Sequence, residues 1–168
     1  MSTHISEQLL TTTIHIKSSD IYKTKNLDGL IKHHLKKLNE GYCGKYGYVI
    51  PNSIKIVKRS VGKAVTHNTE SKVEFGVVYK MKTILPCKGD KYDCIIESIT
   101  KMGIIAYMNT DQESKCNIKD SPVLVIIPEE YIEEKSLDDF EIEQQIKVEI
   151  LESRIKYRSK QIQTVGKI

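Results

Sequence analysis

A long alternation of apolar and polar side chains is the clearest pattern in the chain. Its apolar members recur at every second position, at Val73, Phe75, Val77, Tyr79 and Met81. This period is that of a β-strand with one buried face. The alternation blurs after Lys82 and stops at Pro86, which lacks the N–H that a central strand donates. We therefore expect one long strand that closes a first domain and leads into a second.

Upstream of this strand, residues 26–39 are predicted to form a helix. Five residues at helical spacing give it one apolar stripe: Leu27, Leu30, Ile31, Leu35 and Leu38. Asn26 suits the N-cap and Gly41 the C-terminal stop. Strands are expected at 9–17 and 53–59, polar connections at 18–25 and 60–71, and a glycine- and tyrosine-rich loop at 41–50. The first half is thus expected to be a small α+β sheet with one helix on its face.

The second half is predicted to be all β. Five short strands are expected, at residues 90–100, 104–108, 123–127, 146–151 and 157–165. A polar loop is expected at 109–120 and an acidic connection, with one helical turn near Tyr131, at 129–143. Five strands with an insertion after the third fit an OB-type barrel, whose closure removes free strand edges. The predicted fold class is therefore α+β, with a first domain at 1–82 and an OB domain at 83–168.

The net charge of +4 is unevenly distributed. Residues 1–82 hold 14 basic and 6 acidic side chains, a balance of +8, whereas residues 83–168 hold 12 and 16, a balance of −4. The basic half could meet nucleic acid or an acidic protein surface. A solvated, lysine-rich surface explains the same charges equally well.

The remaining chemistry-bearing residues argue against an enzyme. The four cysteines lie far apart without a C-x-x-C pair, so we expect reduced thiols in an intracellular protein and no metal. The five histidines all precede residue 68, and no nucleophile, base or carboxylate pair is recognisable. We expect no catalytic residue and no cofactor. No apolar run approaches 18 residues and no signal peptide is visible, so no membrane association is expected.

Several short segments, taken in order, resemble one family. They are Glu40 to Tyr48 (EGYCGKYGY), Phe75 to Tyr79 (FGVVY), Pro86 to Asp90 (PCKGD), Gly103 to Ile105 (GII) and Val165 to Ile168 (VGKI). They are similar to the seventh subunit of eukaryotic RNA polymerase II and to its archaeal counterpart. In that family a strand ending F-x-V-x-Y leads through P-F-K-G-E into an OB domain of the ribosomal S-one type.

The resemblance implies a role in transcription. Such subunits form the polymerase stalk with a fourth-subunit-type partner, dock a tip domain on the core enzyme, and hold the OB domain near the emerging RNA. The implied core-docking residues are Gly44, Lys45, Tyr46, Gly47 and Tyr48. The sequence is rich in Lys and Ile, and this composition is consistent with a divergent member of the family, such as one from a large DNA virus. The implied location is the nucleus for a cellular protein, or host cytoplasm and virion for a viral one.

Basic residues near the last predicted strand suggest an RNA contact. Arg154, Lys156, Arg158 and Lys160 recur at every second position, so in a strand they would share one face. Lys101 and Tyr107 could extend this face, because OB domains bind single strands beside their second and third strands. Ile104 stands where the family often has an aromatic residue, which weakens base stacking.

Two alternatives remain open for these residues and for the protein. The basic stripe could simply be the outward face of an edge strand, where Lys and Arg discourage aggregation. The alternative function is a free-standing OB-fold protein that binds single-stranded RNA in translation or RNA decay. Such a protein needs no segment like Glu40 to Tyr48, which speaks for the stalk.

Overall fold

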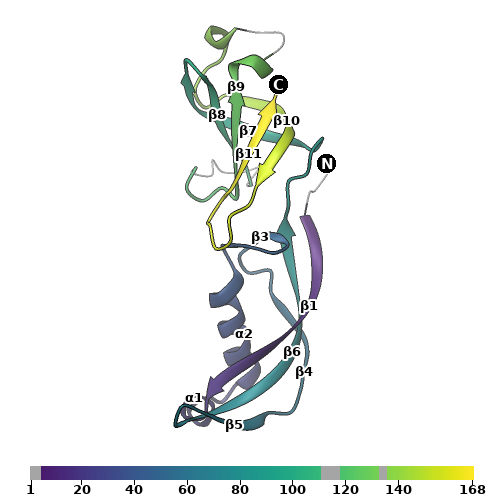
Figure 1. Cartoon of the computed structure of the whole chain (residues 1–168), viewed down its shortest axis with the longest axis vertical. Helices are drawn as coiled ribbons and strands as arrows, with labels where there is room; N and C mark the ends of the chain where they lie inside the picture. Colours follow the sequence, from purple (N-terminus) through teal and green to yellow (C-terminus); the bar gives the residue numbers. More distant parts are fainter. Residues whose placement is uncertain (1–4, 111–117, 133–135) are drawn as a thin grey trace. The chain divides into compact units, whose positions relative to one another are not determined.

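The computed structural model describes residues 5–110, 118–132 and 136–168. It is mostly β, with few helices and one closed barrel of five strands (Figure 1). The described chain divides into two compact units. One contains residues 5–41 and 49–83, and the other contains residues 42–48 and everything from residue 84 onward. The predicted polar loop at 109–120 and acidic connection at 129–143 lie partly outside the described residues.

The first unit is built on β6 (Glu70–Ile84), the long strand that the sequence predicts. β1 (Ile5–Lys17), β4 (Lys55–Arg59) and β5 (Lys63–His67) all pair with β6, and the sheet continues through β3 (Gly47–Val49) to β2 (Cys43–Gly44). The predicted alternation is confirmed, since Phe75 is 2% and Tyr79 5% exposed. Thr83 continues the buried face, where its Oγ1 lies 3.1 Å from Ser6 Oγ.

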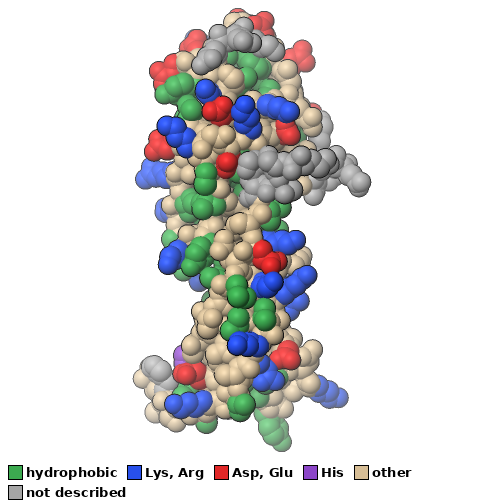
Figure 2. Space-filling model, turned by 90° about the vertical axis from the view of Figure 1, so that its right-hand side faces the viewer, with side chains coloured by type: hydrophobic (Ala, Val, Ile, Leu, Met, Phe, Trp, Pro, Cys, Tyr) green, Lys and Arg blue, Asp and Glu red, His purple; other side chains and the backbone are tan. Residues whose placement is uncertain are grey.

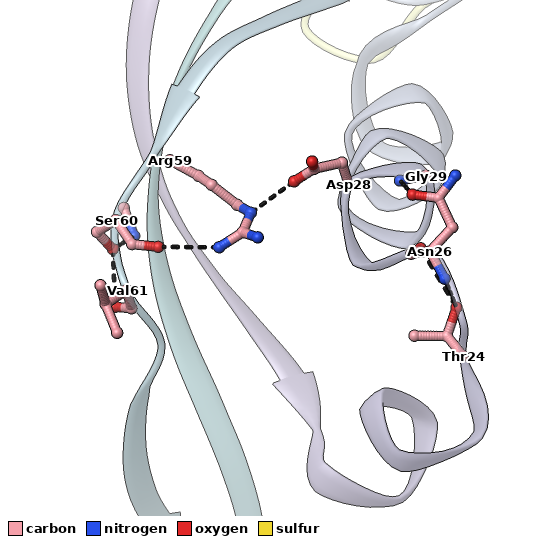
Figure 3. A network of polar contacts seen from close by, with 8 residues as sticks. Thr24, Asn26, Asp28, Gly29, Arg59, Ser60 and Val61 are labelled. Atoms are coloured by element: carbon pink, nitrogen blue, oxygen red, sulfur yellow. Dashed lines mark hydrogen bonds and ion pairs between the residues drawn. The ribbon is translucent and has the colours of Figure 1, made fainter.

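Helix α2 (Leu27–Asn39) confirms the predicted helix, and a polar network holds its first turn (Figure 3). Asn26 is the N-cap, and its Oδ1 accepts a hydrogen bond of 2.9 Å from Gly29 N–H. Asp28 forms an ion pair of 2.5 Å with Arg59 of β4, so the helix is tied to the sheet. The same guanidinium lies 5.9 Å from the ring centroid of Phe75, and therefore covers the buried face of β6.

Three local predictions in this unit are wrong. Helix α1 (Ser18–Lys23) replaces the first part of a predicted polar connection, and β1 begins four residues earlier than expected. β5 replaces part of the predicted loop at 60–71. β5 and β6 form a two-residue hairpin at Asn68 and Thr69, which both have positive φ, 46° and 66°. Such hairpins are usually signalled by Asn-Gly, so Asn-Thr carried no recognisable signal.

The second unit contains the closed barrel, in the order β10-β11-β9-β8-β7. Its strands are β7 (Lys91–Thr100), β8 (Gly103–Met108), β9 (Val123–Pro128), β10 (Gln145–Arg154) and β11 (Ile162–Lys167). β9 and β11 are parallel and the other pairs antiparallel. Two short 3-10 helices, Glu129–Tyr131 and Leu137–Asp139, lie between β9 and β10. This barrel is consistent with the predicted OB type.

Branched aliphatic side chains fill the barrel. Those with no exposed surface include Ile96, Ile104, Val123, Val125, Ile127, Val148, Ile150 and Ile162. β8 begins at Gly103, which has a φ of 143° and lies so close to the carbonyl oxygen of Ile127 that a Cβ atom would collide with it. Only glycine allows this approach of the two strands.

Replacing Phe75 tests the buried face of β6. We expect Phe75→Ala to lower the free energy of unfolding by about 3–5 kcal/mol, because it leaves a cavity beneath Arg59. Val57→Ala, at a side chain that is 52% exposed on β4, is the control and should change stability by less than about 0.5 kcal/mol. Urea denaturation of both variants measures the difference. Equal stability of the two would contradict the assigned core.

Candidate nucleic-acid interface

The basic residues near the end of the chain lie mostly in a loop. β10 ends at Arg154, and β11 begins only at Ile162. Lys156, Arg158 and Lys160 therefore belong to the connection, in which Arg158 has a φ of 62°. The prediction that these residues share one strand face is wrong, because β10–β11 pairing ends where Arg154 lies opposite Gln163. We call residues 155–161 the basic loop.

The two residues expected to extend this group do not join it. In the β7–β10 pair, Glu149 lies opposite Lys91, so Arg154 extends past the first residue of β7. Lys101 follows the last residue of β7, at the other end of the barrel. Tyr107 lies on β8 opposite Leu124 but is only 6% exposed, so its ring offers little surface for stacking.

Acidic side chains gather at the end of the barrel away from the basic loop. The connection after β9 starts beside the β7–β8 turn, where Glu129 N–H donates to Met102 O at 3.2 Å. The exposed acids of this connection include Glu129, Glu130, Asp138, Asp139, Glu141 and Glu143. Figure 2 shows red acidic side chains at this end. The negative balance of the second half is therefore not a property of the basic loop.

The basic loop is attached to the hairpin formed by β2 and β3. Cys43 N–H donates to Ser159 O at 2.8 Å, and Arg158 N–H donates to Cys43 O at 2.9 Å. Beneath these bonds, Cys43 packs with Tyr48 and Ile162, and Ile155 of the loop lies against this cluster. The segment resembling a core-docking tip and the segment expected to contact RNA thus lie side by side in one compact unit (Figure 1).

The five residues that the resemblance suggested for core docking have different surroundings. Gly47 has a φ of 104°, and a Cβ atom there would collide with Ile84 O, so this position requires glycine. Tyr48 is buried in the cluster with Cys43. Gly44 pairs with Gly47, which leaves Lys45 and Tyr46 as the two-residue turn. Lys45 is exposed and its Nζ lies 5.5 Å from the Tyr46 ring centroid. A partner can therefore reach Lys45 and Tyr46, but not Tyr48.

A pocket of about 500 Å³ lies beside the basic loop. It is lined by Arg154, Ile155, Lys156, Ser159, Gln161 and Gln163. Gln161 Nε2 donates to Ser121 O at 3.0 Å and also to Ile118 O, and Ser159 Oγ donates to Gln161 O at 2.8 Å. These bonds hold part of the pocket wall in place. Sequence reasoning missed this pocket, because Ser121, Gln161 and Gln163 form no recognisable motif.

Charge and aromatic surface occur together around the basic loop. Tyr157 is 75% exposed within the loop, and Tyr46 is half-buried in the neighbouring hairpin. Cations that contact phosphates and aromatic rings that stack on bases are the usual components of a single-stranded nucleic-acid site. In residues 5–110, 118–132 and 136–168, no group of three or more His, Cys, Asp or Glu side chains could hold a metal ion.

Cysteine reactivity tests the attachment of the loop. Burial raises the pKa of the Cys43 thiol, and burial raises the pKa of Cys94 to about 12. Both thiols should stay protonated and unreactive at pH 8, whereas exposed Cys87 should react with iodoacetamide. Ile155→Ala should increase the labelling rate of Cys43, and Tyr157→Ala should not. Peptide mass spectrometry distinguishes the sites, and equal native labelling of Cys43 and Cys87 would contradict the assigned packing.

The chain matches no protein-family model and no curated protein sequence. Among the helices of the described chain, none is long and apolar enough to cross a membrane.

Proposed function

We propose that this protein is a non-catalytic stalk subunit of a multisubunit DNA-directed RNA polymerase. The observation that carries the proposal is the ordered resemblance, from about Leu10 to Ile168, to the family of the seventh polymerase subunit and its archaeal counterpart. In this proposal residues 1–82 supply the tip domain, of which residues 42–48 belong to the compact unit of the barrel, and residues 83–168 supply an OB domain of the ribosomal S-one type. A closed barrel of five strands with an insertion after the third supports the second assignment.

Core docking is assigned to the turn of the β2–β3 hairpin. Lys45 and Tyr46 are accessible there, and tyrosine is a frequent anchor of protein interfaces. The ends of the hairpin turn are packed, because Gly47 lies close against Ile84 O and Tyr48 is buried. A turn held at its ends loses less conformational freedom when it binds a partner. Core polymerase subunits are the proposed partners, together with a fourth-subunit-type stalk protein.

Contact with emerging RNA is assigned to the basic loop. The loop carries Lys156, Arg158 and Lys160, and Arg154 adjoins it at the end of β10. Because Cys43 on strand β2 of the hairpin is hydrogen-bonded to the basic loop, docking through the hairpin would hold this loop close to the enzyme. Contacts to phosphate would dominate, so binding should be weak and sensitive to salt.

The basic loop also supports a second candidate function. A free-standing protein that binds single-stranded RNA in translation or RNA decay would use the same loop and barrel, since neither depends on a polymerase. The two functions differ in what the hairpin turn does. It is a docking site in a stalk subunit and has no required partner in a free-standing protein.

Substituting the hairpin turn distinguishes these functions. We expect the double variant Lys45→Glu/Tyr46→Ala, tagged and purified from its native source, to recover at least about 10-fold less polymerase core than the wild type. Tyr22→Ala/Lys23→Glu is a matched control, because it changes an adjacent exposed tyrosine and lysine on α1. Circular dichroism should show that both variants are folded. Absence of polymerase subunits from the wild-type preparation would refute the stalk function.

Substituting the basic loop tests the RNA contact. We expect Arg154→Glu/Lys156→Glu/Arg158→Glu to weaken binding of a short single-stranded RNA at low salt by at least about 10-fold. For the wild type, the logarithm of the affinity should fall with the logarithm of the salt concentration, by about 0.7 for each phosphate contacted. Fluorescence anisotropy measures both. If the wild type binds no RNA even at low salt, the barrel has a structural role only.

A further inference from the structure

We propose that the pocket beside the basic loop binds one nucleotide through a terminal phosphate group, with the phosphate held between Arg154 and Lys156. This inference rests on the proposed RNA contact, but it assigns a defined ligand to one place in it. The nucleotide could be free or could be the phosphorylated end of an RNA strand. Both sources present the same phosphomonoester.

The pocket is suited to an anion. Among the described residues that line it, Arg154 and Lys156 are cationic and none is acidic. In the described part of the chain, neither Arg154 nor Lys156 forms an ion pair, so both charges remain for a ligand. The planar guanidinium of Arg154 can hold two phosphate oxygens at once, while the ammonium of Lys156 acts as a point charge.

Hydrogen bonding within the pocket wall also favours an acceptor ligand. Gln161 uses its amide group to donate to Ile118 O and Ser121 O, and Ser159 donates its hydroxyl hydrogen to Gln161 O. These bonds hold the wall, and among the described lining residues they leave Arg154, Lys156 and the Gln163 amide as donors for a ligand. A phosphate, which has several acceptor oxygens, matches such a set of donors.

The charge and the volume of the pocket indicate which kind of phosphate group it binds. A phosphomonoester carries about −1.5 to −2 charges near pH 7 and so matches two cations better than the single charge of an internal diester. A volume of about 500 Å³ is much larger than a phosphate ion needs and lies in the range typical of small-molecule sites. The remaining space, bordered by Ile155, can take the sugar and base. The pocket therefore fits a nucleotide with a terminal phosphate.

Titration calorimetry with the full chain tests the proposal, using AMP, adenosine and inorganic phosphate as probes. We expect AMP to bind, adenosine to bind at least about 10-fold more weakly, and phosphate to compete with AMP. Arg154→Gln/Lys156→Gln should weaken AMP binding by about 10-fold or more. Lys101→Gln/Lys147→Gln, which removes two exposed cations elsewhere on the barrel, should leave it unchanged. Equal AMP affinity of the two double variants would overturn the proposal.

Short RNAs that differ only in a 5′-phosphate distinguish a free nucleotide from the end of an RNA strand as the ligand. They also distinguish failure of the nucleotide pocket from failure of the proposed RNA contact. Tighter binding of the phosphorylated RNA than of AMP supports a strand end as the ligand, whereas equal binding supports a free nucleotide. If RNA binds with the expected salt dependence but AMP does not bind and the 5′-phosphate has no effect, the nucleotide pocket is refuted and the RNA contact stands. If AMP binds but RNA lacking a terminal phosphate does not, the proposed RNA contact fails and the pocket stands.

Discussion

The alternation of β6 is the constraint on which the first unit depends. Residues 73–81 keep one face of this strand apolar, and three other strands of this unit pair with this one strand. Slipping a neighbour by one residue would turn its whole apolar set to solvent, so burial excludes odd shifts. Burial alone does not exclude a shift of two residues. The ion pairs Glu7–Lys80 and Lys17–Glu70 favour the observed register, because β1 contributes the acid at one end and the base at the other.

The candidate site also depends on one interaction, the attachment of the basic loop to the β2–β3 hairpin. Residues 155–161 leave the barrel after β10, and the two backbone hydrogen bonds that Cys43 exchanges with Arg158 and Ser159 join them to the β2–β3 hairpin. These bonds help to hold Arg158 at a positive φ, which is unfavourable for a residue with a side chain. The buried cluster under the loop supplies the opposing stabilisation. Binding groups on a loop held in this way lose less entropy when a ligand arrives.

Patterns that are local in the sequence predicted the structure well. The period of two in β6 gave the buried positions of Phe75 and Tyr79, and the period near 3.6 gave α2 with Asn26 as its N-cap. The same period of two misled at Arg154 to Lys160, because alternation of charge in a solvated loop looks like the exposed face of a strand. What decides between them is whether a partner strand exists, and that information is not local. The pairing of Cys43 with Ser159 joins segments far apart in the chain, so no window of sequence could reveal it.

The distribution of charge explains why the overall balance of a domain is a poor guide to its ligands. The acidic balance of residues 83–168 argues against RNA only if the acids lie near the contact. β7, ten residues long, separates the basic loop from the turn where the acidic connection begins, a distance of roughly 30 Å along the strand. Electrostatic interactions between exposed charges decay over about 8 Å at physiological ionic strength. A phosphate at Arg154 would therefore experience the cations of the loop far more strongly than the acids of this connection, and of the nearer acids the exposed Glu152 and Asp120 oppose it.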